Sequence, residues 1–190
     1  MGLSDKNLLF YQNSKYFFPQ PFSDVISGAD KKFNFDKNII YSIIRQESAF
    51  DKFARSHADA FGLMQLIPEV AEKNQKQLDL GYKNPDDLFI PQINVGIGTM
   101  YLSNQWRKFS DSFILATASY NAREEAIWGW VKTRYNKNSL YFIEDIPYEE
   151  TRNYIKLVMR NYLIYSFINE NNVGYFPENL LKIKGKTNEK

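Results

Sequence analysis

The sequence predicts a mainly α-helical fold, and two observations support this prediction. Apolar residues recur at helical spacing through most of the chain, as at Ile93, Ile97, Met100 and Tyr101. Residues typical of helix starts, such as proline and aspartate, precede several of these segments. The 190 residues, with 44% hydrophobic and 24% charged, suit one globular domain with a real core, or at most two small ones.

The N-terminal half predicts helices joined by turns and one polar loop. Pro21 suits the first turn of a helix over "PFSDVISGADKKF". Asp36 is a plausible N-cap for the next helix, which carries "IIYSIIRQESAF". "DKFARSHADAF" is rich in polar and small residues and predicts a loop. "GLMQLIPEVAEKN" predicts a turn at Gly62 and then a helix with Pro68 in its first turn.

The C-terminal half predicts a turn-rich connector followed by several helices. "GYKNPDDLFIP" is turn-rich, and "PQINVGIGTMYLSNQWRKF" predicts a helix. "DSFILATASYNA" is nearly all apolar, which predicts a buried central helix. "EEAIWGWVKTRY" predicts another helix, after which a linker leads to a long final helix from Pro147.

Glu47 stands at an unusual position. Ile40, Ile43 and Ile44 form one stripe of the predicted helix, and Glu47 continues that stripe. A charge on an apolar face is costly unless it is paired or neutralised. Two explanations are open: Glu47 is solvated or paired with a nearby arginine at the helix end, or it is a desolvated carboxyl. Burial would raise its pKa and let it donate a proton near neutral pH, as a glycosidase acid must.

Composition excludes several other kinds of chemistry. The chain has no cysteine, so disulfides, cysteine nucleophiles and thiolate metal sites are ruled out. His57 is the single histidine, which excludes a multi-histidine metal site, and its loop position predicts a solvated side chain. The net charge of +2 leaves no strong footprint for nucleic acid. No apolar stretch is long enough to span a bilayer, and the first residues lack the architecture of a signal peptide.

The segment that begins at Glu47 resembles the first motif of the soluble lytic transglycosylases, bacterial enzymes that cleave the glycan strands of peptidoglycan. The match comprises "ESAF", Ser56 and "GLMQL" followed by Pro68. Three further segments match the same family in order: "INVGIGTMYLSNQW", "ATASYNAREEAIWGW" and "IPYEETRNYIKLV". "YFFPQPFSDVI" is similar to the segment that leads into the catalytic domain of the large ring-shaped members. Four ordered motifs make the resemblance specific.

The resemblance implies a lysozyme-like α-helical domain with a substrate groove, in which a minor β-ribbon is also allowed. It implies an N-terminal lead-in segment and helix over residues 1–35, a catalytic domain over 36–170 and a C-terminal tail over 171–190. The ring-shaped members carry a long helical superhelix ahead of this domain. We therefore expect the chain to be an excised catalytic domain or a minimal natural form.

The resemblance also implies a mechanism with one carboxylate, Glu47. This residue would protonate the oxygen between N-acetylmuramic acid and N-acetylglucosamine. It would then remove the proton of the C6 hydroxyl of the muramyl sugar, which closes a 1,6-anhydro ring. The family lacks a partner carboxylate, and the 2-acetamido group of the substrate would stabilise the cationic centre. We expect no metal and no cofactor.

Other site residues carry over one by one. Tyr120 resembles the tyrosine that lies beside the catalytic glutamate or the acetamido group, although a buried helix also explains it as a core residue. Glu150 matches a groove residue that contacts sugar or stem peptide, and it equally suits the first turn of a helix as a dipole partner. Asn121 follows Tyr120, and Tyr154 shares a helix face with Glu150. Three further residues match the lining of the sugar subsites: Ser56, Met64 and Gln65.

Arg123 departs from the family pattern, which usually has glycine after Tyr-Asn-Ala. Glycine would allow a positive φ or a close approach of the backbone. Arginine therefore either changes the start of the next helix or adds a cation near the anionic substrate.

Two rival functions stay open: a hydrolase of the same fold, such as a goose-type lysozyme, and a non-catalytic glycan-binding module. We expect a monomer whose partners are peptidoglycan glycan strands and muropeptides, with no nucleic acid. We also expect a periplasmic or cell-envelope location, with this chain as a mature or excised form.

Overall fold

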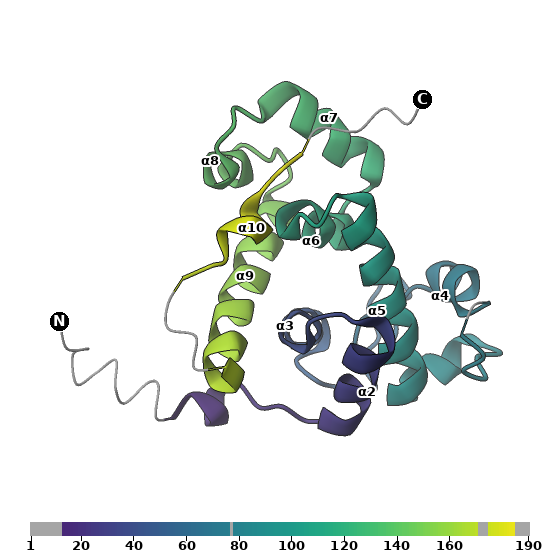
Figure 1. Cartoon of the computed structure of the whole chain (residues 1–190). Coiled ribbons are helices and arrows are strands. Elements are labelled where there is room, and N and C mark those ends of the chain that lie inside the picture. Colours follow the sequence, from purple (N-terminus) through teal and green to yellow (C-terminus); the bar gives the residue numbers. More distant parts are fainter. Residues whose placement is uncertain (1–12, 77, 171–174, 185–190) are drawn as a thin grey trace.

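The structure is a computed structural model that describes residues 13–76, 78–170 and 175–184. Helices dominate these residues, as expected (Figure 1). Their bounds are α2 (Ser23–Phe33), α3 (Lys37–Ser48), α4 (Pro68–Gln75), the 3₁₀ helix η1 (Pro85–Phe89), α5 (Pro91–Lys108), α6 (Phe113–Asn121), α7 (Glu124–Arg134), α8 (Ser139–Glu144), α9 (Glu149–Glu170) and α10 (Glu178–Leu181). In place of the β-ribbon that was allowed, the described residues form two isolated antiparallel bridges, Arg55 with Phe61 and Phe61 with Leu66.

The helix starts follow the expected local chemistry. The Asp36 side chain accepts a hydrogen bond of 2.8 Å from the Asn38 backbone N–H, which confirms the predicted N-cap of α3. Pro68 stands in the first turn of α4, also as predicted. The final helix begins at Glu149, two residues after the predicted start at Pro147.

One helix was missed in the segment that the sequence suggested was a linker. The Asn138 side chain caps α8 by accepting the backbone N–H groups of Leu140 and Tyr141, each at 3.1 Å. Phe142 and Ile143 are buried beneath this short helix. Six residues are too few to display a helical period, so α8 forms through its cap and its tertiary packing.

Helix α3 lies in the middle of the fold, with α9 packed along it and α2 beside it (Figure 1). All residues from Asn38 to Ile44 are buried, so α3 is enclosed on every side over this stretch and not along one stripe alone. The buried Asn38 side chain bonds to Glu170 and Asn169, each at 2.6 Å, which ties the start of α3 to the end of α9. The C-terminal turn of α3, which carries Glu47, emerges from the core.

Helix α6 is the buried central helix that the sequence predicts, with all residues from Phe113 to Ser119 buried. It packs against α5, α9, α7 and α10. A second apolar cluster lies under α7, α8 and the first half of α9, and it includes Trp130, Phe142 and Ile183. Ile183 shows that the described part of the C-terminal tail packs against the body of the protein. No helix among the described residues is both long and apolar enough to cross a bilayer.

Candidate active site

The chain turns sharply directly after Glu47, at the end of α3. Ala49 and Phe50 both adopt left-handed backbone conformations, with φ of 48° and 70°. Such values are uncommon for residues other than glycine. The Ser48 hydroxyl donates to the Leu63 carbonyl at 2.8 Å and accepts the Phe50 N–H at 3.2 Å. Ser48 therefore fixes the helix end that carries Glu47 to the loop over residues 61–66.

Gly62 is required by the geometry of that loop. Its φ is +72°, and an added Cβ would lie 2.2 Å from the Leu88 carbonyl oxygen and 2.4 Å from the Asn94 side-chain nitrogen. Both distances are far below a normal contact, so a side chain here would displace the backbone of η1 or the Asn94 amide.

Asn94, which is fully buried in α5, organises the same loop. Its Oδ1 accepts the Met64 N–H at 2.8 Å, and its Nδ2 donates to the carbonyls of Phe61 and Leu88, each at 2.8 Å. Sequence reasoning missed this role, although Asn94 lies within the motif "INVG". The available signal was an amide on an otherwise apolar helix face, where a buried polar group needs partners.

Glu47 is half-buried and accepts a 2.5 Å hydrogen bond on Oε1 from the Tyr154 hydroxyl of α9. The pKa of Glu47 is raised to about 7, and burial is the largest cause. The charge of Glu150 also raises this pKa, whereas the Tyr154 hydrogen bond lowers it. The arginines that could have paired with it are engaged elsewhere. Arg45 lies 4.0 Å over the Phe18 ring, and Arg55 forms an ion pair with Asp59 of its own loop. The geometry favours a desolvated acid over a solvated ion pair.

Tyr120 lies close enough to Glu47 for the two groups to interact electrically. The pKa of its hydroxyl is raised well above 10, first by burial and then by the negative charge of Glu47. The hydroxyl donates to the Met64 carbonyl at 3.3 Å. The Tyr120 ring packs against the Tyr101 ring with 5.4 Å between centroids, and the Tyr101 hydroxyl donates to the Ser119 carbonyl. Two tyrosines from α5 and α6 thus form one wall beside Glu47.

Asn121 joins the end of α6 to the first turn of α9. Its Nδ2 donates to Glu150 at 2.9 Å, and its Oδ1 accepts from the Thr151 hydroxyl at 2.5 Å. Glu150 is exposed, and its charge reaches Glu47. Its position suits both expectations, as a group facing the site and as a first-turn acid. Thr151, which the sequence reasoning did not single out, completes this link.

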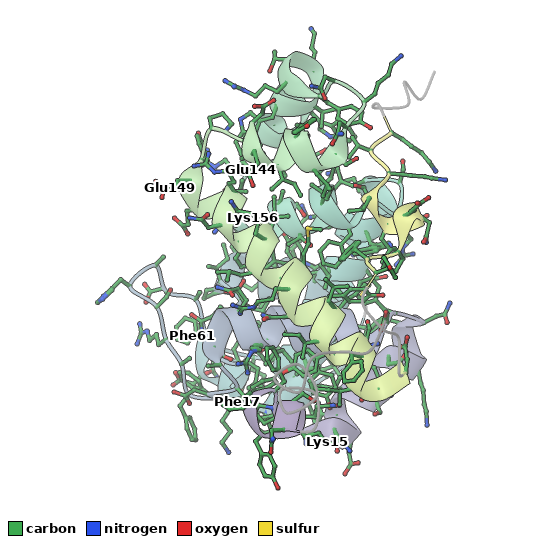
Figure 2. All side chains as sticks on the ribbon, turned by 90° about the vertical axis from the view of Figure 1, so that its left-hand side faces the viewer. Lys15, Phe17, Phe61, Glu144, Glu149 and Lys156 are labelled. Atoms are coloured by element: carbon green, nitrogen blue, oxygen red, sulfur yellow. The ribbon has the colours of Figure 1, made fainter. Side chains whose placement is uncertain are left out.

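Figure 2 shows the side of the molecule where the loop with Phe61 lies below the start of α9, which carries Glu149. Glu47 is bonded to Tyr154, one turn further along α9, while Ser48 is tied to the same loop as Phe61. The loop after α3 and the start of α9 therefore border the Glu47 carboxyl from two sides.

Ser56 and Gln65 stabilise loops beside the site through their side chains. The Ser56 hydroxyl accepts two backbone N–H groups of its own loop, at 3.1 and 3.2 Å. The Gln65 amide donates to the carbonyls of Ala54 at 3.1 Å and Gly62 at 2.9 Å. These bonds use the nitrogen of the Gln65 amide and leave its oxygen unused in the hydrogen bonds described.

Met64, which the resemblance places at the lining of the sugar subsites, can border the site only through its backbone. Its side chain is fully buried, and its sulfur lies so close to Gly98 that a Cβ there would be 2.4 Å away. The Met64 carbonyl, which accepts the Tyr120 hydroxyl, is the part of the residue that faces the site.

Arg123 precedes α7 with φ −69° and ψ 145°, an extended conformation that any residue adopts. The chain therefore does not use the conformational freedom of glycine at this point, and the start of α7 is not strained. The change adds an exposed cation two residues after Asn121.

The described part of the chain contains no group of three His, Cys, Asp or Glu side chains placed to hold a metal ion. His57 is exposed.

Comparison with known proteins identifies relatives of this chain. Residues 24–143 match the family model described as the transglycosylase SLT domain. The soluble lytic murein transglycosylase of Salmonella typhimurium is 32% identical over 144 residues, which is 75% of this chain and 22% of that protein. The crystal structure of the 70 kDa soluble lytic transglycosylase of Escherichia coli superposes with a TM-score of 0.78 at 30% identity, covering 82% of this chain and 26% of that one.

A second structure is similarly close. An inactive mutant of the lytic transglycosylase Slt of Pseudomonas aeruginosa has a TM-score of 0.76 at 32% identity, covering 80% of this chain and 25% of that one. This chain and the two relatives of known structure share the helical, lysozyme-like fold that the motifs implied. The chain spans about a quarter of the length of these relatives.

Proposed function

Because the chain belongs to the transglycosylase SLT domain family, we propose that it is a peptidoglycan lytic transglycosylase in which Glu47 is both acid and base. The observation that carries this proposal is the state of the Glu47 carboxyl. It is half-buried, its pKa is raised to about 7 by burial, and a tyrosine hydroxyl fixes one of its oxygens. A group that first donates and then accepts a proton works best when its pKa is near the working pH.

In the first step, protonated Glu47 donates its proton to the glycosidic oxygen between N-acetylmuramic acid and N-acetylglucosamine. The bond from this oxygen to the anomeric carbon breaks, and N-acetylglucosamine leaves with the proton on its hydroxyl. Tyr154 holds Oε1, so Oε2 is the oxygen that would carry the proton. The 2-acetamido group of the muramyl sugar stabilises the positive charge at the anomeric carbon.

In the second step, the C6 hydroxyl of the same sugar attacks the anomeric carbon, and the Glu47 carboxylate takes up its proton. A 1,6-anhydro ring forms, Glu47 returns to its protonated state, and no water is consumed. The Tyr154 hydrogen bond supports this step because it stabilises the carboxylate between the two transfers.

The neighbouring residues would shape the site around the muramyl sugar. Tyr120 stands next to Glu47, where its ring would border the acetamido group. Asn121 holds Glu150 at the edge of the site, where the carboxylate would contact sugar or stem peptide. Ser56 and Gln65 would shape the sugar subsites by holding their loops in place. The side-chain oxygen of Gln65 would accept a hydrogen bond from the sugar.

The products of digested sacculi test the proposal. Mass spectrometry should find muropeptides with 1,6-anhydro ends from the wild-type protein and none from Glu47→Gln, which keeps the shape of the side chain but cannot transfer the proton. Reducing ends would instead support a hydrolase such as a lysozyme. Cleavage that survives in Glu47→Gln would show that Glu47 is not the catalytic residue.

The site of action follows from the substrate. Peptidoglycan lies in the cell envelope, and we propose that the protein acts there, as a monomer on glycan strands. One structure of the 70 kDa relative is a complex with bulgecin A. We propose that bulgecin A also binds near Glu47 in this protein, where it would compete with glycan strands.

A further inference from the structure

A large pocket lies at the start of α3, and no step of the proposed reaction uses it. Its volume is about 690 Å³, within the usual range for sites that bind small ligands. Its walls come from the end of α2, the end of α5, the middle of α9 and the segment around α10. We refer to it as the α3-start pocket, and its lining includes Phe35, Asp36, Ile39, Trp106, Arg107 and Tyr162.

This pocket is separate from the catalytic site. Asp36 caps the start of α3, whereas Glu47 lies in the last turn of the same helix. The eleven residue steps between them span about 16 Å along a helix. Neither Tyr120 nor Tyr154 lines the pocket. Figure 1 shows α3 almost end-on, with α5 and α9 on either side of it. A ligand of this pocket and a sugar bound at Glu47 would therefore be separated by the length of α3.

Asp36 places a carboxylate in the pocket wall, and it has no ion-pair partner in the described part of the chain. The carboxylate accepts the Asn38 N–H at 2.8 Å and a hydrogen bond from the Tyr162 hydroxyl. Burial is the largest cause that raises the pKa of Asp36, and the negative charges of Glu170 and Asp30 raise it further. The pKa stays raised in spite of both hydrogen bonds and the partial positive charge of the helix start. A cation brought close to this carboxylate would therefore be attracted to it.

Aromatic rings line the pocket together with this carboxylate. Phe35 packs against Trp106 with 5.3 Å between the ring centroids, and Trp106 packs against the buried Phe113 at 5.9 Å. Phe113 also contacts the Tyr162 ring at 5.5 Å. The rings are therefore held in place by one another before a ligand arrives. The face of an aromatic ring attracts an ammonium ion, and tryptophan does so most strongly.

The charges of the described lining favour a cation over an anion. Arg107 is the cation in this lining, and its guanidinium is bonded within its own helix. It donates to the Ser103 carbonyl and to the Ser103 hydroxyl at 3.3 and 3.2 Å, and to the Asn104 side chain at 3.3 Å. Asp111 adds a second, exposed carboxylate to the same lining. Two carboxylates therefore face one guanidinium.

We propose that the α3-start pocket binds a small organic ammonium ion, with its ammonium group on the Asp36 carboxylate and its apolar body against the Trp106 ring. The ammonium supplies the positive charge and the N–H donors that a carboxylate accepts. Ile39 and Leu180 would cover the apolar body from α3 and α10. The inference goes beyond the proposed function and does not depend on the reaction at Glu47.

NMR titrations with two matched probes test this inference. 2-Phenylethylamine carries an ammonium group at neutral pH, and 2-phenylethanol has the same skeleton with an uncharged hydroxyl in its place. The amine should bind about tenfold more tightly than the alcohol, because only the amine forms a charge pair with Asp36. The signals that move should be those of the Trp106 indole N–H and of the backbone amides of residues 33–36.

Asp36→Asn is the decisive variant, because asparagine caps a helix as well as aspartate does and should keep the fold. In this variant the amine should lose its advantage and bind as weakly as the alcohol. Asp79→Asn is the matched control, since it removes the same charge at an exposed position outside the pocket. It should bind both probes like the wild type.

Three results would overturn the inference. The first is equal affinity of the wild type for the amine and the alcohol, and the second is an advantage of the amine that survives Asp36→Asn. The third is a set of probe-induced signal changes that lies entirely outside the pocket. Each can be read whether or not the protein cleaves glycan strands, so failure of this inference is distinct from failure of the proposed function.

Discussion

The Tyr154 hydroxyl donates a 2.5 Å hydrogen bond to the Glu47 carboxyl across 107 residues of chain. Tyr154 is buried in α9, and Glu47 is half-buried in the last turn of α3, so the bond links two helices that pack together at the centre of the fold. Burial and this hydrogen bond act on the pKa of Glu47 in opposite directions, and burial is the larger influence. Their balance leaves the pKa at about 7.

Removing the Tyr154 hydroxyl should raise the pKa of Glu47. Tyr154→Phe deletes a donor that stabilises the carboxylate, and the loss should be about one pKa unit, or about 1.4 kcal/mol. The alkaline limb of the pH profile of kcat/KM, which reports loss of the catalytic proton, should move up by that amount. Tyr165→Phe is the control, because the Tyr165 hydroxyl bonds to the Pro19 carbonyl and not to Glu47. An alkaline limb that stays in place or moves down would contradict the role of Tyr154.

The raised pKa of Glu47 also predicts how stability depends on pH. Between pH 4.5, the ordinary pKa of a glutamate, and about pH 7, the folded protein holds a proton on Glu47 that the unfolded chain has lost. The free energy of unfolding should therefore fall as pH rises through this window, by about 2–3 kcal/mol after allowing for partial solvent screening. Glu47→Gln has no such proton and should lose less stability between pH 5 and pH 8.

Urea unfolding of both proteins at the two pH values measures this difference. The wild type and Glu47→Gln should be closest in stability at the lower pH, where Glu47 is neutral, and diverge at the higher pH in favour of the variant. Parallel curves for the two proteins would show that the Glu47 carboxyl is not desolvated.

Asn94 should contribute strongly to stability through its three hydrogen bonds to the backbone. Asn94→Ala leaves the Met64 N–H and the carbonyls of Phe61 and Leu88 without their partner, which should cost about 3–5 kcal/mol. Denaturant unfolding checks this value. Asn153→Ala, at an exposed position of α9, should change the unfolding free energy by less than about 0.5 kcal/mol. A similar, small effect of both substitutions would rule out Asn94 as the organiser of the loop.

Gly62 and Gly129 should respond to the same substitution in opposite directions. Gly62→Ala meets the Leu88 carbonyl and needs a positive φ, so it should destabilise the protein by about 3 kcal/mol or more. An added Cβ at Gly129 meets nothing within 4 Å inside α7. Gly129→Ala should therefore stabilise the protein by about 0.5–1 kcal/mol, the difference in helix propensity. Thermal unfolding of the two variants would show the contrast, and destabilisation by both would contradict it.

Much of this protein can be read from its sequence because the relevant signals are local. Helical spacing and helix-start residues predict most of the helices, since both act within a few residues of the same chain segment. The isoleucines before Glu47 indicate that a carboxyl could be desolvated, and the ordered motifs identify the family. The short helices η1, α8 and α10 are the exceptions, because their four to six residues carry too little periodicity.

Tertiary structure decided what these residues do. The partner of Glu47 is Tyr154, the Met64 side chain faces the core, and Asn94 binds three backbone groups from two other segments. None of these follows from spacing, because each depends on which distant segments pack together. The sequence by itself determined that Glu47 could be a buried acid. Only the packing of α9 against α3 placed the Tyr154 hydroxyl on its carboxyl. Burial raises the pKa of Glu47, this hydrogen bond lowers it, and the pKa is about 7 as a result.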